Sequence, residues 1–498
     1  MIDEQDSSER PQQPQQPTRL VLVAQDGRAL RPDDQQEYRG GGPPAGGSGG
    51  ASDEAPVFAS EEAMANILVT ADLDGNWRYV SDDRWYHFLD GQCWRNDNVL
   101  GILNLARMVC RKTAQNVQLT TNTRRNISSA KSIYAVERIA RSDPRVATPI
   151  EHFDADPWVI NSPGGLVNLR SGELMPHDRA QLCMKMAGAA PYGDCPQWKL
   201  FIKQVSAGSQ DYADYLQRLV GYSLTGMRSE EIFAFVYGPS NTGKSKFVET
   251  LRLLHGDYGT AAAMDTFIVS KVDRHPTDLA GLVGRRLVTA AETEEGRRWD
   301  QQRLTMLTGR DRVSARFMRG DFFEYVPQFL LLFAGNFRPR LTGVDDAMRR
   351  RMHLLPFTHK PPRIDPHLID KFRAELGGIT AWAVEGCLLW QRYGLQPPAI
   401  VTGATAAYFE LEDSLGQWLD ERCVISDPLN IADFFTPSRE LYRDFRNWYE
   451  HRGFVPSERT FLDRLEIAAP SAQRGRRSDG LRGFFGIVLR GRQANLDL

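Results

Sequence analysis

The stretch GPSNTGKS, Gly238 to Ser245, decides the fold of this chain. It fits the P-loop pattern of Gly, four residues, Gly, Lys, then Ser or Thr. Gly238 and Gly243 let backbone N–H groups turn around phosphate oxygens without a Cβ clash. Lys244 places a cation on the outer phosphates, and the Ser245 hydroxyl can bind Mg²⁺. The predicted nucleotide-binding residues are Gly238, Pro239, Ser240, Asn241, Thr242, Gly243, Lys244 and Ser245.

Both flanks of this loop support the interpretation. The apolar run IFAFVY, Ile232 to Tyr237, is typical of a buried strand, and KFVETLRLLHG after the loop is typical of an amphipathic helix. A helix that begins there aims its N-terminus at the phosphates. The alternative is an ordinary glycine-rich turn, which these flanks disfavour. The sequence therefore predicts that the chain binds and hydrolyses ATP with Mg²⁺.

The composition is that of an ordinary soluble protein. The 498 residues leave room for two to four domains, with 41% hydrophobic and 25% charged residues. A net charge of -2 means that contacts with nucleic acid must come from local patches. Six scattered cysteines without a CxxC pair argue against a zinc site or a disulfide framework. With an acidic N-terminus and no apolar run of membrane-spanning length, we expect a cytoplasmic protein without a membrane partner.

Before the loop, the chain changes character once. Residues 1–62 are rich in Gln, Pro, Gly and Ser and predict a disordered tail. Its apolar island, Thr18 to Gln25, is either a binding peptide or, as we favour, an incidental patch. Residues 63–215 predict an α+β domain, with an antiparallel meander, a helix and two short strands. Trp77, Trp85 and Trp94 in the meander could stack on bases, but their alternating spacing favours core positions.

After residue 215 the pattern becomes strand–helix alternation, which is typical of an α/β core and continues to about residue 360. Residues 361–404 predict a helical extension. Residues 405–498 predict helices followed by a short basic hairpin in GLRGFFGIVLRGR, and this order suggests a winged-helix module.

A P-loop needs an acidic partner that holds Mg²⁺ and polarises water, and GRRLVTAAETEEG supplies candidates. The apolar run ends in Glu292, our first candidate, and Glu294 is the second. We expect this acid at the end of a strand next to the P-loop strand. A solvated acidic turn is the alternative, mainly for Glu294 and Glu295.

Two further motifs follow in a fixed order. QFLLLFAGN ends in Asn336, whose amide can orient water against the γ-phosphate. In DDAMRRRMHLLPF, Arg350 and Arg351 are candidates for an arginine finger that a neighbouring subunit receives and that stabilises charge on the transferred phosphoryl group. A plain basic surface patch is the competing interpretation.

Between the acidic strand and Asn336, ARFMRGDFFEY predicts a hairpin with its turn at residues 318–321. Arg312, Arg316 and Arg319 make this segment basic. A basic hairpin in an ATPase core can enter a central pore and follow the phosphate backbone of single-stranded DNA. A solvated turn is the simpler alternative for the hairpin taken alone.

The order of these motifs resembles that of the superfamily 3 helicases, specifically the C-terminal helicase part of phage and plasmid primases, which is related to the poxvirus primase-helicase. The resemblance covers about 430 of the 498 residues. It rests on GPSNTGKS, LVTAAETEE, LTGRDRVSARFMRGDFFEYVP, LLLFAGN and DDAMRRRMHLLPF, with WVINSPGGLVNLRSGELMPHD and PQWKLFI upstream and ITAWAVEGCLLWQRYGLQPP and SRELYRDFRNWYEHRGF downstream.

The resemblance implies an α/β fold with a P-loop ATPase core of the AAA+ type. An N-terminal α+β helicase-associated domain would precede the core, and a helical, winged-helix domain would follow it. Carried over by position, the resemblance implies phosphate binding by Lys244 and γ-phosphate sensing by Asn336. It implies that Ser245 and Glu292 hold the metal.

The resemblance also implies a trans arginine at Arg350 or Arg351 and contact with single-stranded DNA around Arg319. Family members are hexameric rings that translocate 3′ to 5′, so we expect a homohexamer. Two departures stand out. Arg310 replaces the second glycine of the usual Thr-Gly-Gly-Asp, and no primase domain precedes the helicase part. We therefore expect a separately encoded primase or other replication proteins as partners.

A rival hypothesis is a DNA-binding initiator or regulator in which nucleotide serves only as an assembly switch. Its support is a C-terminal basic run with Asp479 as the one nearby acid, formed by Arg474, Arg476, Arg477, Arg482, Arg490 and Arg492. A solvated tail explains this run equally well. A structural ATPase of another ring family is a third reading, which the compact motif order disfavours.

Overall fold

The computed structural model describes residues 57–81, 84–269, 277–291, 297–341, 346–425, 434–449 and 456–490. Most of the predicted tail, including Thr18 to Gln25, lies outside these ranges. The described chain begins with a 3₁₀ turn, η1 (Val57–Ala59), and helix α1 (Glu61–Ile67). The boundary that we predict at residue 62 therefore falls inside a helix. Ser60 caps α1 by accepting a hydrogen bond from the Ala63 N–H.

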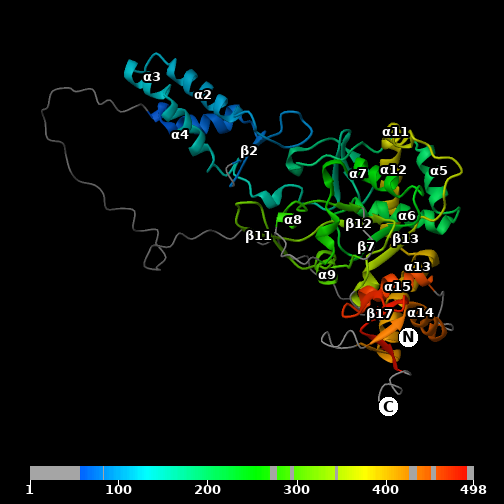
Figure 1. The fold of residues 1–498 in the computed structure, drawn as a ribbon. Coiled ribbons are helices and arrows are strands. Elements are labelled where there is room, and N and C mark those ends of the chain that lie inside the picture. The colour runs from blue at the N-terminus through cyan, green and yellow to red at the C-terminus, as the bar shows by residue number, and fades with distance from the viewer. Residues whose placement is uncertain are drawn as a thin grey trace, which may run out of the picture. The chain divides into compact units, whose positions relative to one another are not determined.

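The first part of the chain is a helical cluster with a small sheet (Figure 1). A π-helical turn, η2 (Leu68–Asp72), follows α1. The antiparallel meander is confirmed as β1 (Trp77–Val80), β2 (Arg84–His87) and β3 (Arg95–Asn96). Helices α2 (Gly101–Ala114), α3 (Thr121–Ile127) and α4 (Ala130–Ala140) complete it. Trp77, Trp85 and Trp94 are 4%, 5% and 1% exposed, so they are core residues and do not offer rings to bases.

A second small sheet leads into the central part of the chain. The two predicted strands are β4 (Val159–Ser162) and β5 (Gly165–Asn168), and a short β6 (Leu174–Met175) extends the antiparallel sheet. Helices α5 (Pro196–Val205) and α6 (Gln210–Ser223) then pack into the same apolar core as the central sheet. The domain boundary predicted at residue 215 thus falls inside α6.

The central sheet has five parallel strands in the order β13-β7-β12-β9-β8. Their bounds are β7 (Phe233–Tyr237), β8 (Gly259–Ala261), β9 (Leu287–Ala291), β12 (Leu330–Gly335) and β13 (Met352–Pro356). Strand β7 alternates between two cores, with Ala234 and Val236 on one face and Phe233 and Phe235 on the other. The expectation that β9 adjoins β7 is wrong, because β12 lies between them.

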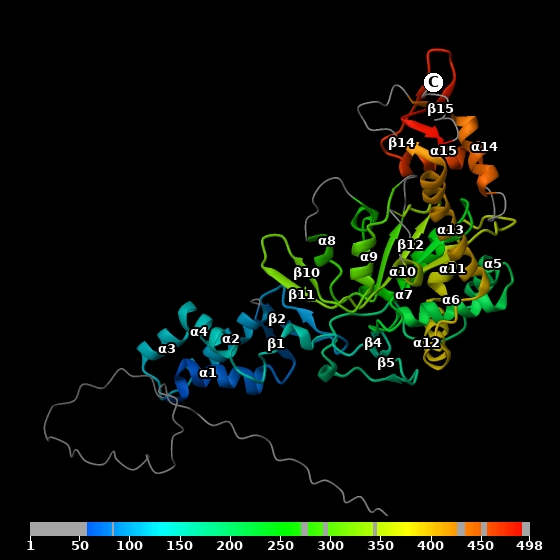
Figure 2. The ribbon, with the colours of Figure 1, turned by 90° about the horizontal axis from the view of Figure 1, so that it is seen from below.

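Helices cover both faces of this sheet (Figure 2). They are α7 (Lys244–His255), α8 (Thr277–Ala280), α9 (Gln301–Thr308), α10 (Asp346–Arg351), α11 (Leu368–Ala374) and α12 (Leu376–Tyr393). Helix α12 touches α6 backbone to backbone at two glycines. A Cβ on Gly221 would lie 2.0 Å from the Cys387 nitrogen, and one on Gly386 would lie 2.2 Å from the Gln217 oxygen. Only glycine permits this approach.

The last part of the chain begins within a long helix, α13 (Ala399–Arg422), so the boundary predicted at residue 404 falls inside it. Two helices, α14 (Ser438–Tyr449) and α15 (Glu458–Ala468), share an apolar core with the end of α13. Five short strands accompany them: β14 (Cys423–Ile425), β15 (Phe435–Pro437), β16 (Gln473–Arg476), β17 (Arg482–Phe485) and β18 (Ile487–Leu489).

The C-terminal hairpin differs from the prediction. The two strands within GLRGFFGIVLRGR do not pair with each other. Strand β17 pairs with β16 upstream and with β15, whereas β18 pairs with β14. Gly486, at φ 82°, lies between them and redirects the chain. The observed hairpin is therefore β16–β17.

Candidate nucleotide and DNA sites

The Gly238–Ser245 loop connects β7 to α7, as predicted, and its backbone requires glycine at both ends. Gly238 has φ 150°, and a Cβ there would lie 2.0 Å from the Phe357 oxygen. Gly243 has φ 93°, and a Cβ there would lie 2.7 Å from the Phe201 ring. No side chain caps the N-terminus of α7, so its first N–H groups face the loop. Such an uncapped helix start fits an anion.

Lys244 is drawn into this loop. Its Nζ donates hydrogen bonds to the carbonyl oxygens of Gly238, at 2.8 Å, and Pro239, at 2.6 Å. The residue is 8% exposed, and burial lowers the pKa of the Lys244 ammonium. Its only close partners among the described residues are neutral carbonyls, so these residues do not neutralise the charge of the buried ammonium. The residue type and its setting fit a phosphate group. Ser245 beside it is exposed.

The strand register brings Asn336 to the carboxyl ends of the parallel strands, where the loop also begins. Gly335, at the end of β12, pairs with Tyr237, at the end of β7, so Asn336 follows directly beside Gly238. Asn336 is exposed. On its other side β12 pairs with β9, with Ala334 opposite Ala291. Glu292, Glu294 and Glu295 come after Ala291 and lie outside the described residues, so their roles stay predictions.

A hollow of about 190 Å³ opens beside the loop and was not predicted from the sequence. Thr242 and Gly243 form one wall, the α5 residues Phe201 and Gln204 a second, and the segment after β13 a third, with His359. It combines the aromatic ring of Phe201 with polar side chains next to the Gly238–Ser245 loop. Its signal in the sequence is weak, because its walls come from three distant segments.

The two candidate finger arginines lie at the other end of the parallel strands, away from the Gly238–Ser245 loop. They end α10, and Met352 directly afterwards begins β13 in register with Phe233, at the start of β7. A five-residue strand is roughly 16 Å long. Neither arginine therefore reaches the Gly238–Ser245 loop of its own chain.

The structure separates the two arginines by their contacts. Arg351 is held within the chain, because its Nη2 lies 3.0 Å from the Glu231 carboxylate. The same carboxylate lies 2.8 Å from the Nε of Arg310, the residue that departs from the family pattern. Arg350 is exposed and forms no ion pair within the described part of the chain. Arg350 is thus the better candidate, and Glu231 is a residue that sequence reasoning missed.

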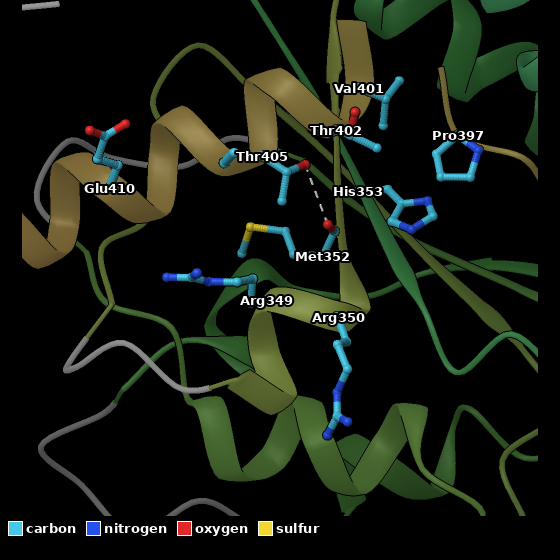
Figure 3. A pocket seen from close by; sticks show the side chains of 10 residues that line it. Arg349, Arg350, Met352, His353, Pro397, Val401, Thr402, Thr405 and Glu410 are labelled. Atoms are coloured by element: carbon cyan, nitrogen blue, oxygen red, sulfur yellow. Dashed lines mark hydrogen bonds between the residues drawn. The ribbon is translucent and has the colours of Figure 1, made fainter. Parts of the chain in front are cut away.

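A pocket of about 540 Å³ adjoins the end of α10 (Figure 3). Arg349 and Arg350 line it together with His353 and the first turns of α13. The side chain of Arg350 extends away from Pro397 and Thr402. On the opposite wall, Thr405 Oγ1 donates a hydrogen bond to the Met352 oxygen at 3.4 Å. The Arg349 guanidinium lies 5.5 Å from the centre of the Phe409 ring. The Arg349 guanidinium therefore has an aromatic contact, and of the two arginines Arg350 is the freer to bind another group.

His353 in this pocket predicts a pH effect. Its Nδ1 lies 2.7 Å from the Tyr215 hydroxyl, and burial lowers the pKa of His353 from 6.5 to about 4. The unfolded chain therefore binds a proton below pH 6.5 that the folded chain refuses until about pH 4, so stability falls as the pH drops through this window. Between pH 6.5 and 5 the loss should be at most about 2 kcal/mol. Urea unfolding of the wild type and His353→Gln tests it. Equal pH slopes in the two proteins would refute the assignment.

The predicted hairpin is confirmed as β10 (Val313–Arg316) and β11 (Phe322–Tyr325), with Arg316 opposite Phe322. Its root is fixed, because Val313 and Ala315 are buried in the core and the Tyr325 hydroxyl donates to the Leu279 oxygen at 2.9 Å. Its turn is exposed. In Figure 2 it projects beside α8 and α9. A hairpin whose base is fixed in the core and whose turn is exposed can transmit movement of the core to its turn.

The hairpin tip carries exposed aromatic and basic groups. Arg312 and Arg319 are exposed and form no ion pair with a described residue. The Arg316 guanidinium lies 4.8 Å from the Phe322 ring centre. Phe317, Met318 and Phe322 are 54%, 74% and 61% exposed, which sequence reasoning did not anticipate. Their apolar surface beside cations suits the bases and phosphates of a single strand.

The C-terminal basic run is smaller than the sequence suggests. Arg474 pairs with Asp463 and Glu466 on α15, so Asp479 is not the one nearby acid. Arg477 pairs with Asp479, and the Arg490 Nε donates to the Cys423 oxygen. Arg476 and Arg482 remain, exposed and opposite each other across β16–β17. Arg492 lies outside the described residues.

Two sequence families match the chain. The family "D5 N terminal like" matches residues 65–207, and a family of unknown function, DUF5906, matches residues 236–351. The second match spans the phosphate-loop candidate, the hairpin and both finger candidates. Together with the helicase name of the relative described next, these matches support a relation to the superfamily 3 helicases, as the motifs predict.

Particular relatives are distant. The chain is 22% identical over 347 residues to a protein of Acanthamoeba polyphaga mimivirus named "Putative helicase L207/L206". The alignment covers 61% of this chain and 36% of that relative, so the chain spans about a third of its length. Two apo structures of the NrS-1 C terminal region align at TM-scores of 0.45 and 0.43, with 9% and 10% identity, over 84% and 86% of this chain and 98% and 99% of theirs. No described helix is both long and apolar enough to cross a membrane.

Proposed function

We propose that this protein is an ATP-dependent replicative DNA helicase of a phage, prophage or plasmid. One observation carries the proposal. A buried lysine with no acidic partner in the described part of the chain lies at one end of the parallel strands, an exposed arginine lies at the other end, and a basic, aromatic hairpin projects from the same core. These are the parts of a motor whose site is completed by a neighbour. The helicase name of the mimiviral relative agrees with this proposal.

The nucleotide would bind at the loop between β7 and α7. The α7 N–H groups and Lys244 would hold the phosphates, and the hollow at Thr242 would receive the base and sugar. Ser245, with Glu292 as its proposed partner, would hold Mg²⁺, which neutralises phosphate charge when bound. Asn336 would orient the attacking water beside the γ-phosphate.

Arg350 would act on the nucleotide of the next subunit. Because it lies across the sheet from its own loop, it would serve a neighbouring site, and this arrangement repeated head to tail gives a ring when the rotation between subunits closes. We therefore propose a homohexamer that translocates 3′ to 5′ on single-stranded DNA. A primase or other replication protein would be its natural partner.

The hairpin would couple hydrolysis to movement along DNA. Arg319→Ala should leave basal ATP hydrolysis largely intact and abolish its stimulation by single-stranded DNA. The reason is that Arg319 is exposed at the hairpin turn and is not among the residues that line the hollow beside the Gly238–Ser245 loop. Hydrolysis with and without oligonucleotide measures this. Arg392→Ala, an exposed arginine on α12, is the control. Loss of basal turnover in Arg319→Ala would contradict the hairpin's role.

One specific observation supports the initiator hypothesis. Arg476 and Arg482 face each other as like charges on the β16–β17 hairpin, an arrangement that costs stability unless an anion lies between them. Together with α14 and α15 they would form a winged-helix surface for duplex DNA. Strand displacement on a forked substrate separates the hypotheses. ATP-driven unwinding supports the helicase, whereas origin-specific binding without unwinding supports the initiator.

A further inference from the structure

A basic surface on the N-terminal helices has no role in the proposed function. Residues 101–140, which contain α2, α3 and α4, hold seven Lys and Arg and one acid, so their net charge is +6. The whole chain has a net charge of -2, which leaves -8 for the remainder. The seven basic residues are Arg107, Arg111, Lys112, Arg124, Arg125, Lys131 and Arg138.

The one acid in this segment cannot neutralise that surface. Glu137 is 3% exposed and points inward, where its carboxylate accepts hydrogen bonds from Trp85 Nε1, at 2.6 Å, and Arg141 Nε, at 2.8 Å. The flanking acid before the segment, Asp97, accepts from the N–H groups of Gly101 and Ile102 at the start of α2. The flanking acid after it, Asp143, pairs with Arg145. These three carboxylates are therefore engaged elsewhere.

The basic side chains are exposed and available. Six of the seven are exposed, and the seventh, Arg124, donates to the neutral Asn116 oxygen. Within the ranges that the structure describes, none of the seven forms an ion pair. Cations on neighbouring helices without acidic partners repel one another, and a polyanion relieves that repulsion.

The spacing on α2 fits a phosphate backbone. Arg107 and Arg111 are one turn apart, on the side away from the buried Ile102, Ala106 and Val109. A rise of 1.5 Å per residue separates them by about 6 Å along the helix axis, close to two phosphate steps of about 3.4 Å on one strand. On α4, Lys131 and Arg138 flank Tyr134, which is 59% exposed. Arg111 and Lys112 also line a hollow of about 780 Å³, with Asp72 as its acidic member.

We propose that the exposed faces of α2–α4 bind the phosphate backbone of DNA, as a second contact distinct from the β10–β11 hairpin. The contact needs no nucleotide and does not depend on ATP hydrolysis. It would hold either the duplex ahead of the motor or the single strand leaving it, since both present the same phosphates.

The test is the salt dependence of DNA binding by the full chain without nucleotide. Fluorescence anisotropy with a labelled duplex and a labelled single strand gives the slope of log affinity against log salt. Arg107→Ala/Arg111→Ala should reduce the steepness of this slope by about 1.8 on duplex, or by about 1.4 on single strand. The strand type whose slope changes by its full expected amount is the ligand. Lys131→Ala/Arg138→Ala on α4 should act in the same direction.

The control removes two charges that already have acidic partners. Lys371 and Arg373 on α11 pair with Asp365 and Asp370, so Lys371→Ala/Arg373→Ala should leave the slope unchanged. Circular dichroism confirms folding of each variant. Unchanged slopes on both DNA forms for the α2 and α4 variants would overturn the proposal and leave this surface to an acidic protein. Basal ATP hydrolysis, measured in parallel, shows separately whether the proposed motor itself fails.

Discussion

Replacement of Lys244 by alanine should lower the rate of ATP hydrolysis by at least about 10²-fold, the scale at which removal of one preorganised donor to a reacting oxygen acts. The ammonium is buried, and among the residues that the structure describes its partners are the Gly238 and Pro239 carbonyls, so it can turn to a phosphate without breaking an ion pair with any of them. Steady-state hydrolysis with saturating ATP and Mg²⁺ measures the effect. Folding should survive, because the two carbonyls border the open loop and can be hydrated.

Lys246→Ala is the matched control for this prediction. Lys246 lies on the same helix two residues later, and its Nζ lies 3.8 Å from the Glu249 carboxylate. Its loss should change hydrolysis less than about twofold, since exposed ion pairs of this kind contribute little. Near-normal turnover in Lys244→Ala, with nucleotide still bound, would remove the phosphate role of the loop.

Arg350→Ala should lower hydrolysis by about 10³-fold or more, the lower end of the range for arginine fingers. Arg350 is exposed and lies in the last turn of α10, at the end of the sheet opposite the Gly238–Ser245 loop, so the loss would act on the neighbour's nucleotide. Arg349→Ala is the matched control, because Arg349 has the same charge on the same helix but lies over Phe409. Hydrolysis should remain close to wild type in that variant.

A mixing experiment shows whether the arginine acts in trans. Lys244→Ala and Arg350→Ala proteins should each be inactive alone. When they are mixed before assembly, some interfaces combine an intact Lys244 with an intact Arg350 from the other variant, so part of the activity should return. Absence of any recovery in rings that contain both variants, verified by native mass spectrometry, would exclude the shared site.

The local parts of this molecule could be predicted from the sequence. The loop at Gly238 and the hairpin around Arg319 are specified by nearest neighbours, because glycine spacing and strand alternation act over a few residues. The order of the strands was not predictable in this way. Strand β9 pairs with β12 and not with β7, and this choice depends on contacts between segments about forty residues apart.

Two of the predicted domain boundaries fall inside helices for a related reason. Helices α6 and α13 continue through residues 215 and 404 because their apolar faces pack on the central core as well as on flanking elements. Strand β18 likewise pairs with β14, more than sixty residues upstream, instead of its neighbour. Glu231 was missed because its importance comes only from Arg310 and Arg351, which approach it through the fold.

Glu231 gives the proposed motor a common joint. Arg310 leads into the β10–β11 hairpin, Arg351 adjoins the proposed finger Arg350, and both hold one carboxylate. The Arg310 side chain is 70% exposed, so its contact is worth only about 1 kcal/mol or less and can be made and broken within each cycle. A subunit that pulls its strand would therefore loosen the support of the arginine it lends next door. Timing around the ring would then pass through a single acidic side chain.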